Sequence, residues 1–401
     1  MNLTIFGQSN ELLSSANKKA SPYSPDNVGG LSPHELAGQV NVITSAVPFL
    51  IIAPESRGGA MGDVGVATSP DINSMHWNVA KFAFIESDFG VGLSYTPWLR
   101  KLVDDINLSY LTAYKRIDDK QAISASLRYF SLGYITFTNQ SGHELTEYNP
   151  NEFAIDVGYA LKLSKFFSGG VGLRYIYSNL TGGFNAEGTS NTHAANGVAA
   201  DIGVFYTNPK LKISKKKTTL NFGLSITNIG NKVSYTDEAE KNFIPTNLRL
   251  GTSMSMELDN YNSLALAVDL NKFLIPTPPK VVVENGVRKL YGKISDVSVA
   301  KGIFQSFSDA PGGMKEELHE ITYSVGLEYY YAKQFAIRAG YFSEHETKGN
   351  RKYFTVGIGL KLNVFGLNFS YLMPTQQHNP LENTVRFSLL LDFEKLKKEK
   401  E

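Results

Sequence analysis

The sequence predicts an all-β transmembrane barrel of about fourteen antiparallel strands with an N-terminal plug. First, apolar residues recur at every second position in many segments; Phe354, Val356 and Ile358, for example, alternate with small or polar residues. Second, the connections between these segments are alternately short and long. Third, Tyr 21, Phe 24 and Gly 35 accompany only 19% charged residues. A strand with one face in lipid and the other in a polar lumen requires period-two alternation, and bacterial outer-membrane barrels use an even number of strands.

The overall composition excludes several other classes of protein. Lys+Arg 39 against Asp+Glu 38 leave a net charge of +1, which is too small for the broad positive field of a nucleic-acid binder. The chain has no cysteine, so thiolate metal sites, cysteine nucleophiles and disulfides are excluded. No apolar run is long enough for a membrane-spanning helix, so the membrane class that remains is the barrel.

In chain order, the first expected unit is a flexible segment over residues 1–39, which is polar and rich in Ser, Pro and Asn. Residues 40–87 are expected to form a plug, because a fourteen-stranded barrel is wider than its own side chains fill. This stretch carries a short apolar run and a glycine-rich run that suits backbone packed closely inside a lumen. The plug residues singled out are Pro48, Phe49, Arg57, Gly62, Asp63, Trp77 and Asn78.

The barrel is expected over residues 88–393 and a periplasmic tail over residues 394–401. The predicted strands begin near Phe89, Ile106, Ile123, Phe153, Val171, Val198, Leu220, Leu248, Leu264, Ile321, Phe335, Phe354, Leu367 and Val385. Short connections are predicted at 118–120, 164–165, 259–262, 332–334 and 363–366, and long ones at 138–152, 179–197, 230–245, 274–320, 343–351 and 374–383. Short periplasmic turns opposite long outer loops are typical of outer-membrane barrels and place both termini in the periplasm. The connection at 208–218 is longer than this pattern predicts and is interpreted as a solvated, lysine-rich turn.

The two faces of the strands are expected to carry different residues. Tyrosines such as Tyr95 and Tyr110 are expected on the lipid-facing side, as in aromatic girdles, and Leu111, Phe205 and Leu390 inside. The charged residues expected to point into the lumen are Arg128, Asp156, Arg174, Asp201, Arg249, Asp269, Glu328, Arg338 and Arg386. We interpret these charges as an electrostatic lattice that holds the barrel and its plug together, with a selective ion path as the alternative.

Catalytic and cofactor motifs are scarce, so the protein is expected not to be an enzyme. The seven histidines show no metal-ligand spacing, which predicts no metal site and no cofactor. The run from Gly62 to Gly65 lacks the lysine and the strand-to-helix context of a phosphate-binding loop. Ser141, His143 and Glu144 share one outer loop and leave hydrolysis at the membrane surface open as an alternative.

The long outer loops are the expected place for partner binding, because a rigid barrel displays them and they exceed the length of simple connectors. Phe184 is the one large apolar residue of its polar loop, and Trp98 lies in a motif typical of an interfacial anchor. Ile303, Phe304 and Phe307 belong to an expected short amphipathic helix, either packed on the rim or offered to a partner. These five residues are the candidate contacts for cargo or partners.

The plug stretch resembles a known family. Residues 43–50, 53–69 and 77–84 are similar to motifs of PorV, the outer-membrane shuttle family of the type IX secretion system. The similarity covers most of residues 40–393, with the loops most divergent. One departure is that the family's usual Trp-Asn-Pro-Ala has Val79 in place of proline. The PorV family is related to fatty-acid transporter (FadL-like) barrels, so the resemblance implies a FadL-like barrel.

The resemblance implies a non-enzymatic carrier in the outer membrane of a Gram-negative bacterium. Such proteins are thought to collect secreted cargo, which bears a C-terminal signal domain, from the translocon barrel and to pass it to a surface sortase complex. Outer-membrane lipid is a further expected contact, whereas nucleic acid is not. Two alternatives stay open: a FadL-like transporter of hydrophobic small molecules, and a lipopolysaccharide deacylase.

Overall fold

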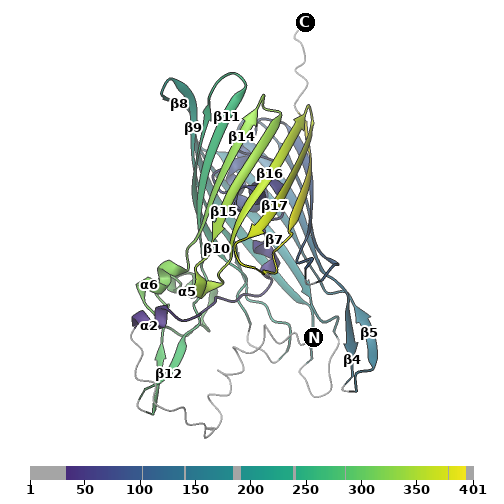
Figure 1. The fold of residues 1–401 in the computed structure, drawn as a ribbon, viewed down its shortest axis with the longest axis vertical. Coiled ribbons are helices and arrows are strands. Elements are labelled where there is room, and N and C mark those ends of the chain that lie inside the picture. Colours follow the sequence, from purple (N-terminus) through teal and green to yellow (C-terminus); the bar gives the residue numbers. More distant parts are fainter. Residues whose placement is uncertain are drawn as a thin grey trace.

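The structure is a computed structural model that describes residues 33–393 apart from residues 102, 140, 184–190, 238–240, 285 and 378. Fourteen of the described strands form one closed antiparallel barrel (Figure 1). They are β1 (Phe89–Pro97), β2 (Ile106–Arg116), β3 (Gln121–Leu132), β6 (Asn151–Lys162), β7 (Phe167–Asn179), β8 (Ala195–Ile213), β9 (Lys216–Gly230), β10 (Asn247–Glu257), β11 (Asn262–Phe273), β14 (Thr322–Tyr331), β15 (Phe335–Ser343), β16 (Lys352–Leu362), β17 (Phe365–Pro374) and β18 (Val385–Phe393). Each strand pairs with the next barrel strand along the chain, and β18 pairs with β1 to close the ring.

The predicted number and order of strands are confirmed. Every predicted start lies within four residues of an observed one, the largest differences being Val171 against Phe167 and Leu220 against Lys216. The alternation also separates an outer from an inner face, as predicted. Phe354, Val356 and Ile358 are all about half exposed on the outer wall, while the residues between them are buried. Period two therefore identifies the lipid-facing side in most strands.

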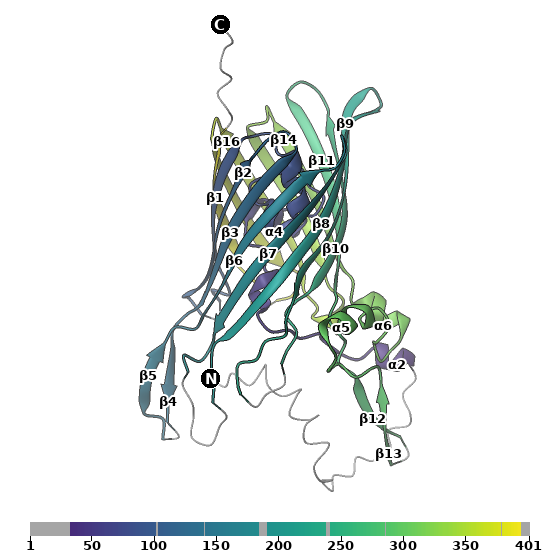
Figure 2. The same cartoon turned by 180° about the vertical axis from the view of Figure 1, so that it is seen from behind.

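The interpretation of residues 208–218 as a long solvated turn is wrong, because most of these residues belong to two paired strands. Strands β8 and β9 continue through it as a hairpin that extends past the barrel at its short-turn end (Figures 1 and 2). Ser214 and Lys215 have φ of 49° and 66° and form a tight two-residue turn, whose positive φ values match the twist of paired strands. Lysines occupy both faces of this extension, so period-two alternation does not reveal it.

The faces of β2 are the reverse of the sequence-based assignment. Tyr110 is fully buried inside the barrel, whereas Leu111 is 44% exposed on the outer wall. Both faces of β2 are apolar, as buried Leu108 on the inner face illustrates, so alternation alone does not separate them and a one-residue shift exchanges the faces. Phe205 and Leu390 lie inside, as predicted.

The plug passes once through the barrel, from the long-loop end to the short-turn end (Figures 1 and 2). It consists of the short helices η2 (Pro48–Ile51), α3 (Ser56–Ala60), α4 (Ser74–Trp77) and η3 (Val79–Phe84) and the turns between them. At the long-loop end, the Ala46 N–H donates to the Phe243 carbonyl at 2.8 Å. At the other end the chain enters β1 at Phe89, which pairs with Phe393. Most residues between 53 and 83 are buried, so the plug is part of the core.

The first and last described parts of the chain therefore lie at opposite ends of the barrel, whereas the expectation that both termini are periplasmic concerns residues outside the described ranges. The described chain begins with α2 (Pro33–Ala37), and the Asn41 N–H donates to the carbonyl of Thr347 in a long loop. A plug that crosses the lumen once has to enter at the end opposite to the start of β1. Of the segment 1–39, expected to be flexible, residues 33–37 form helix α2 with Leu36 buried; residues 1–32 and 394–401 lie outside the described residues.

The long-loop end carries further elements that the alternation does not reveal. Two hairpins project from it, β4 (Ile135–Thr138) with β5 (Glu144–Tyr148) and β12 (Lys280–Glu284) with β13 (Val287–Tyr291) (Figure 1). Helices α5 (Val299–Gln305) and α6 (Met314–His319) follow β13, and η4 (Glu346–Lys348) lies between β15 and β16. Helix α5 includes Ile303 and Phe304 of the predicted amphipathic segment and ends before Phe307. In the described part of the chain, no helix combines the length and apolarity needed to span a membrane.

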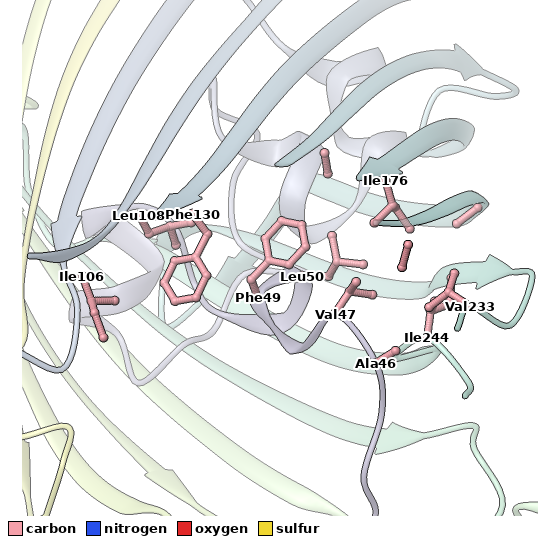
Figure 3. Packing of buried hydrophobic residues seen from close by; sticks show 13 residues of the cluster. Ala46, Val47, Phe49, Leu50, Ile106, Leu108, Phe130, Ile176, Val233 and Ile244 are labelled. Atoms are coloured by element: carbon pink, nitrogen blue, oxygen red, sulfur yellow. The ribbon is translucent and has the colours of Figure 1, made fainter. Parts of the chain in front are cut away.

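A hydrophobic cluster fills the lumen at the long-loop end (Figure 3). Val47, Phe49 and Leu50 of the plug meet residues of the wall, and the Phe49 ring stacks on Phe130 at 6.3 Å with an interplanar angle of 3°. Trp98 packs against the edge of the same cluster. Apolar contact therefore holds the entry of the plug, and the rest of the plug is held by the closer contacts described next.

The glycine-rich run places plug backbone directly against the wall. A Cβ atom on Gly340 of β15 would lie 2.1 Å from the backbone nitrogen of Gly62, which is far below any real contact. Gly62 itself has φ of 72° and faces the backbone of Tyr341, so both sides of this contact require glycine. The predicted role of the run, close packing inside a lumen, is consistent with this geometry.

We expect Gly340→Ala to destabilise the protein by about 1–3 kcal/mol, because the added methyl group displaces the plug from the wall. The measurement is the urea midpoint of the protein in detergent, followed by its heat-modifiable migration. Gly169→Ala is the matched control, since a Cβ atom there meets only Leu163 at 3.6 Å. Equal stability of the two variants would contradict a direct backbone contact.

Candidate functional site

One buried ion cluster links the plug to β14 and β15. Arg57 of α3 donates to both carboxylate oxygens of Glu328 at 2.9 and 2.7 Å, and Arg338 donates to the same carboxylate at 2.7 Å. Arg57 also bonds Asp71 of the plug at 2.8 Å. Because Glu328 and Arg338 are about 3% exposed, each would be an uncompensated buried charge without its partners.

Other wall charges bond the plug backbone rather than one another. Arg128 donates to the Leu50 carbonyl at 2.5 Å, Arg249 to the His76 carbonyl at 2.8 Å and Arg386 to the Ala53 carbonyl at 3.1 Å. The negatively charged Asp269 instead accepts from the backbone N–H groups of Gly65 and Val66, at 2.7 and 2.9 Å. Backbone groups in irregular segments need such partners when they are buried. These four wall residues therefore satisfy plug backbone that its short helices leave unpaired.

The remaining lumen charges form a triad within the wall. Arg174 of β7 donates to Asp156 of β6 at 2.5 Å and to Asp201 of β8 at 3.0 Å. Asp201 also accepts from the backbone N–H of Asn228 at 2.7 Å. All nine lumen residues singled out from the sequence are buried inside the barrel, and their contacts are with the plug or with neighbouring strands.

Within the plug, Trp77 explains the glycine-rich motif. Its indole N–H donates to Glu55 at 3.0 Å, and Glu55 also caps α3 by accepting from the Gly58 N–H at 2.7 Å. Cβ atoms at Gly58 and Gly65 would lie 2.5 and 2.0 Å from the Trp77 ring, so glycine is needed on both sides of it. The Arg249 guanidinium stacks on the ring at 5.1 Å.

The remaining plug residues hold individual turns. Asn78 accepts from the Ala80 N–H at 3.1 Å and donates to the carbonyl of Val204 in β8 at 2.9 Å, so it caps η3 and ties it to the wall. Asp63 accepts from the Tyr353 hydroxyl at 2.6 Å. Pro48 begins η2, where a missing N–H costs nothing. Val79 holds the same first position in η3, which the family's proline would also fit.

A small cavity lies inside the lumen, beside the plug. The cavity between the plug and strands β10 to β16 has a volume of about 70 Å³, which holds a few water molecules. Arg249 and Asp63 line it. Because the bonded plug crosses the lumen and this cavity is small, a large partner has to bind outside the lumen.

At the long-loop end, a second buried ion cluster builds a rigid loop domain. Lys272 at the end of β11 bonds Glu317 at 3.1 Å and Glu320 at 2.5 Å, both from the α6 region. Lys348 of η4 bonds Glu316 at 2.7 Å and Glu320 at 2.9 Å. Asn41 also donates to Glu316, at 2.9 Å, so the segment before the plug joins the cluster. We use the name loop domain for residues 274–320 as far as they are described.

Electrostatics differ among the acids of the loop domain. Burial, together with the nearby carboxylate of Glu317, raises the pKa of Asp309 to about 6. Burial acts in the same direction on Glu316, but its hydrogen bond to Lys348 prevails and lowers its pKa. Asp309 accepts from the Thr277 N–H at 3.2 Å and from Gln305 at 3.4 Å, and Glu320 lies near it.

The sequence-predicted loop contacts are scattered. Trp98 and Ile303 are half-buried, whereas Phe304 is 79% and Phe307 46% exposed. Phe184 lies outside the described residues. The structure therefore brings only Phe304 and Phe307 together on an accessible face.

The residues considered for hydrolysis form an ordinary turn. The backbone N–H groups of Ser141 and His143 both donate to the Asn139 side chain at 2.9 Å, which closes the β4–β5 hairpin. Both residues are exposed, and the bonds of this turn are made by their backbone and not by their side chains. Sequence reasoning missed the Lys272 and Lys348 cluster, although the acidic run 316–320 next to a long loop was a visible signal.

Comparison with known proteins gives one family and several related folds. The sequence model described as "Type IX secretion system protein PorV" matches residues 35–280, which is more than half of the chain. Comparison with curated proteins gives no significant match.

The similar solved structures include the toluene transporter TbuX of Ralstonia pickettii, at 10% identity and a TM-score of 0.47, covering 84% of this chain and 98% of that one. The toluene transporter TodX of Pseudomonas putida is similar at 11% identity and 0.48, with 88% and 98% covered. A FadL homologue of Pseudomonas aeruginosa is similar at 11% and 0.44, with 88% and 100% covered.

We expect Glu328→Gln to destabilise the protein by about 3–5 kcal/mol, because Arg57 and Arg338 then share a neutral partner in a buried site. Urea unfolding in detergent measures the loss. The control is Arg116→Ala, which breaks a partly exposed pair with Asp88 and is expected to cost at most about 1 kcal/mol. Similar losses in the two variants would show that the cluster does not hold the plug.

The stability of the loop domain is expected to fall as pH rises between about 4 and 6, since the folded state holds the proton of Asp309 more tightly than the unfolded state does. Hydrogen exchange of residues 305–320 at several pH values measures this slope. Asp309→Asn should remove it, whereas Glu316→Gln, which loses a carboxylate whose pKa is lowered, should leave it in place. An unchanged slope in Asp309→Asn would exclude Asp309 as its source.

Proposed function

The chain belongs to the PorV family of type IX secretion system proteins, and we propose that it acts as a non-enzymatic carrier in the outer membrane. In this proposal it binds cargo through a C-terminal signal domain as the cargo leaves the translocon barrel, and transfers it to the surface attachment and sortase complex. The long-loop end faces the cell surface, as in other outer-membrane barrels, and the short-turn end faces the periplasm.

The observation that carries the proposal is the bonded plug. Buried wall charges hold its backbone along the lumen, and the cavity beside it has a volume of about 70 Å³. A folded cargo protein is far too large for this space. A filled lumen leaves no passage for cargo, and the family's role in secretion requires contact with it. Binding at the long-loop end is compatible with both.

The two projecting hairpins supply a plausible chemistry for recognising cargo. Within the described residues, β4 pairs only with β5 and β12 only with β13, so each hairpin is a two-stranded sheet with no third strand beside it. The edges of such sheets accept an additional strand from another protein. Hairpin β12–β13 adds exposed apolar side chains, namely Val281, Val287 and Leu290, and stands on the braced loop domain.

The alternatives have less support. Transport of a hydrophobic molecule past the plug would use apolar lumen residues, but Leu111, considered for such a path, lies on the outer wall. A deacylase would need an acid, a base and a nucleophile in contact, and the turn that holds Ser141 and His143 offers no such arrangement.

We expect removal of the β12–β13 hairpin to lower cargo capture about tenfold, or ~1.4 kcal/mol. Residues 281–290 are replaced by Asn-Gly, which rejoins Lys280 and Tyr291 because these residues pair across the hairpin. The amount of cargo that co-purifies from membranes is measured, and heat-modifiable migration checks the barrel.

The matched control removes residues 137–146 of the β4–β5 hairpin in the same way, since Thr136 pairs with Glu147. Its effect on capture should be smaller. Normal capture by the β12–β13 variant would contradict the assignment of cargo to this hairpin, and normal capture by a variant that lacks both hairpins would contradict a carrier that works through projecting edges.

A further inference from the structure

The exposed face of the loop domain is unusually apolar for a segment outside the barrel. Phe304 and Phe307 of the α5 region are 79% and 46% exposed, and Met314 and Leu318 of α6 are 68% and 54% exposed. Met314 and Leu318 are four residues apart and therefore share one side of α6. Exposed apolar side chains gathered in this way mark a contact with a protein or a membrane.

Two acidic residues at the C-terminal end of α6 fix its position relative to the barrel wall. Glu317 and Glu320 bond Lys272 of β11 at 3.1 and 2.5 Å. Lys272 has the same parity along β11 as Leu266 and Leu270, which are exposed on the lipid-facing wall. Side chains two residues apart in a strand point to the same face. Glu317 and Glu320 therefore attach α6 to the outward-facing side of β11, at the rim of the barrel.

This attachment lies next to the lipid-facing surface. Leu270 pairs with Tyr323 of β14, whose ring is 47% exposed on the outer wall, and Lys272 is only two residues, or about 7 Å, further along β11. Leu318 precedes Tyr323 by five residues. Figures 1 and 2 show α5 and α6 at the level of the rim and to the side of the barrel, in both views. The apolar face thus continues the lipid-facing band into the zone of the headgroups.

The charged residues around α5 and α6 also fit a position at the membrane surface. Lys293, Lys301 and Lys315 are exposed around α5 and α6, whereas Glu316 and Glu317 are turned inward to the buried cluster. Lysines beside exposed aromatic and aliphatic residues are typical of segments that lie in the interface of an anionic membrane. A lipid surface therefore suits the face better than an acidic protein, since the wall beneath it already contacts lipid.

We propose that the α5–α6 face rests on the membrane leaflet at the long-loop end, with Phe304, Phe307, Met314 and Leu318 in the interface and the lysines at anionic headgroups. The loop domain is then a support that fixes how far the β12–β13 hairpin stands from the membrane. The hairpin extends away from the barrel in both views (Figures 1 and 2), so Val287 lies in water. This inference concerns the purified chain alone and does not depend on the carrier proposal.

The test uses the lack of cysteine in the chain, which makes an introduced cysteine the one site for a label. Phe304→Cys, Leu318→Cys and Val287→Cys are labelled with an environment-sensitive fluorophore, and the full chain is placed in nanodiscs of phosphatidylcholine and phosphatidylglycerol without partners. Labels at positions 304 and 318 should emit at shorter wavelength than the label at position 287 and should be quenched by nitroxide-bearing lipids. The label at position 287 should not be quenched.

A second variant separates membrane contact from mere shielding. Phe304→Ser with Phe307→Ser, made in the Leu318→Cys protein, should reduce lipid quenching at position 318 while the heat-modifiable barrel stays intact. The proposal is overturned if either label at 304 or 318 behaves like the label at 287. It is also overturned if shielding at 318 arises only when cargo or translocon is added, since the face would then be a protein interface.

Discussion

The structure depends on one constraint, which is that a fourteen-stranded barrel encloses more space than its own side chains fill. Here chain backbone fills that space, and backbone away from water has to be hydrogen-bonded. Arg128, Arg249 and Arg386 supply donors to plug carbonyls, and Asp269 supplies an acceptor to plug amides. Since an isolated buried charge costs several kcal/mol, the wall charges need the plug as much as the plug needs them.

The same constraint supports the proposed place of partner binding. Because bonded plug backbone crosses the lumen, the proposal places a large partner at the long-loop end, where a buried ion cluster joins the loops. Lys272 and Lys348 bring β11, η4 and α6 together around three glutamates, and Asn41 ties the segment before the plug to them. The projecting hairpins and the apolar helical face are therefore presented by a rigid support.

Much of this architecture could be predicted from local patterns, because period two reports which face of a strand meets lipid. The method fails where both faces are alike, as in β2, where Tyr110 and Leu111 exchange places. It also fails for contacts between distant residues. Lys272 and Glu317 are 45 positions apart, and no local pattern connects them. The inward charges were visible in the sequence, but their bonds to plug carbonyls depend on the path of the plug, which alternation does not describe.

The path of the plug has a consequence for how the molecule is assembled. The segment from Asn41 to Phe89 runs through a ring that closes only when β1 pairs with β18, and it is fastened beyond the ring at Thr347. The ladder between β1 and β18 therefore closes the wall around the plug, and opening this one ladder would free the plug sideways without threading either of its ends.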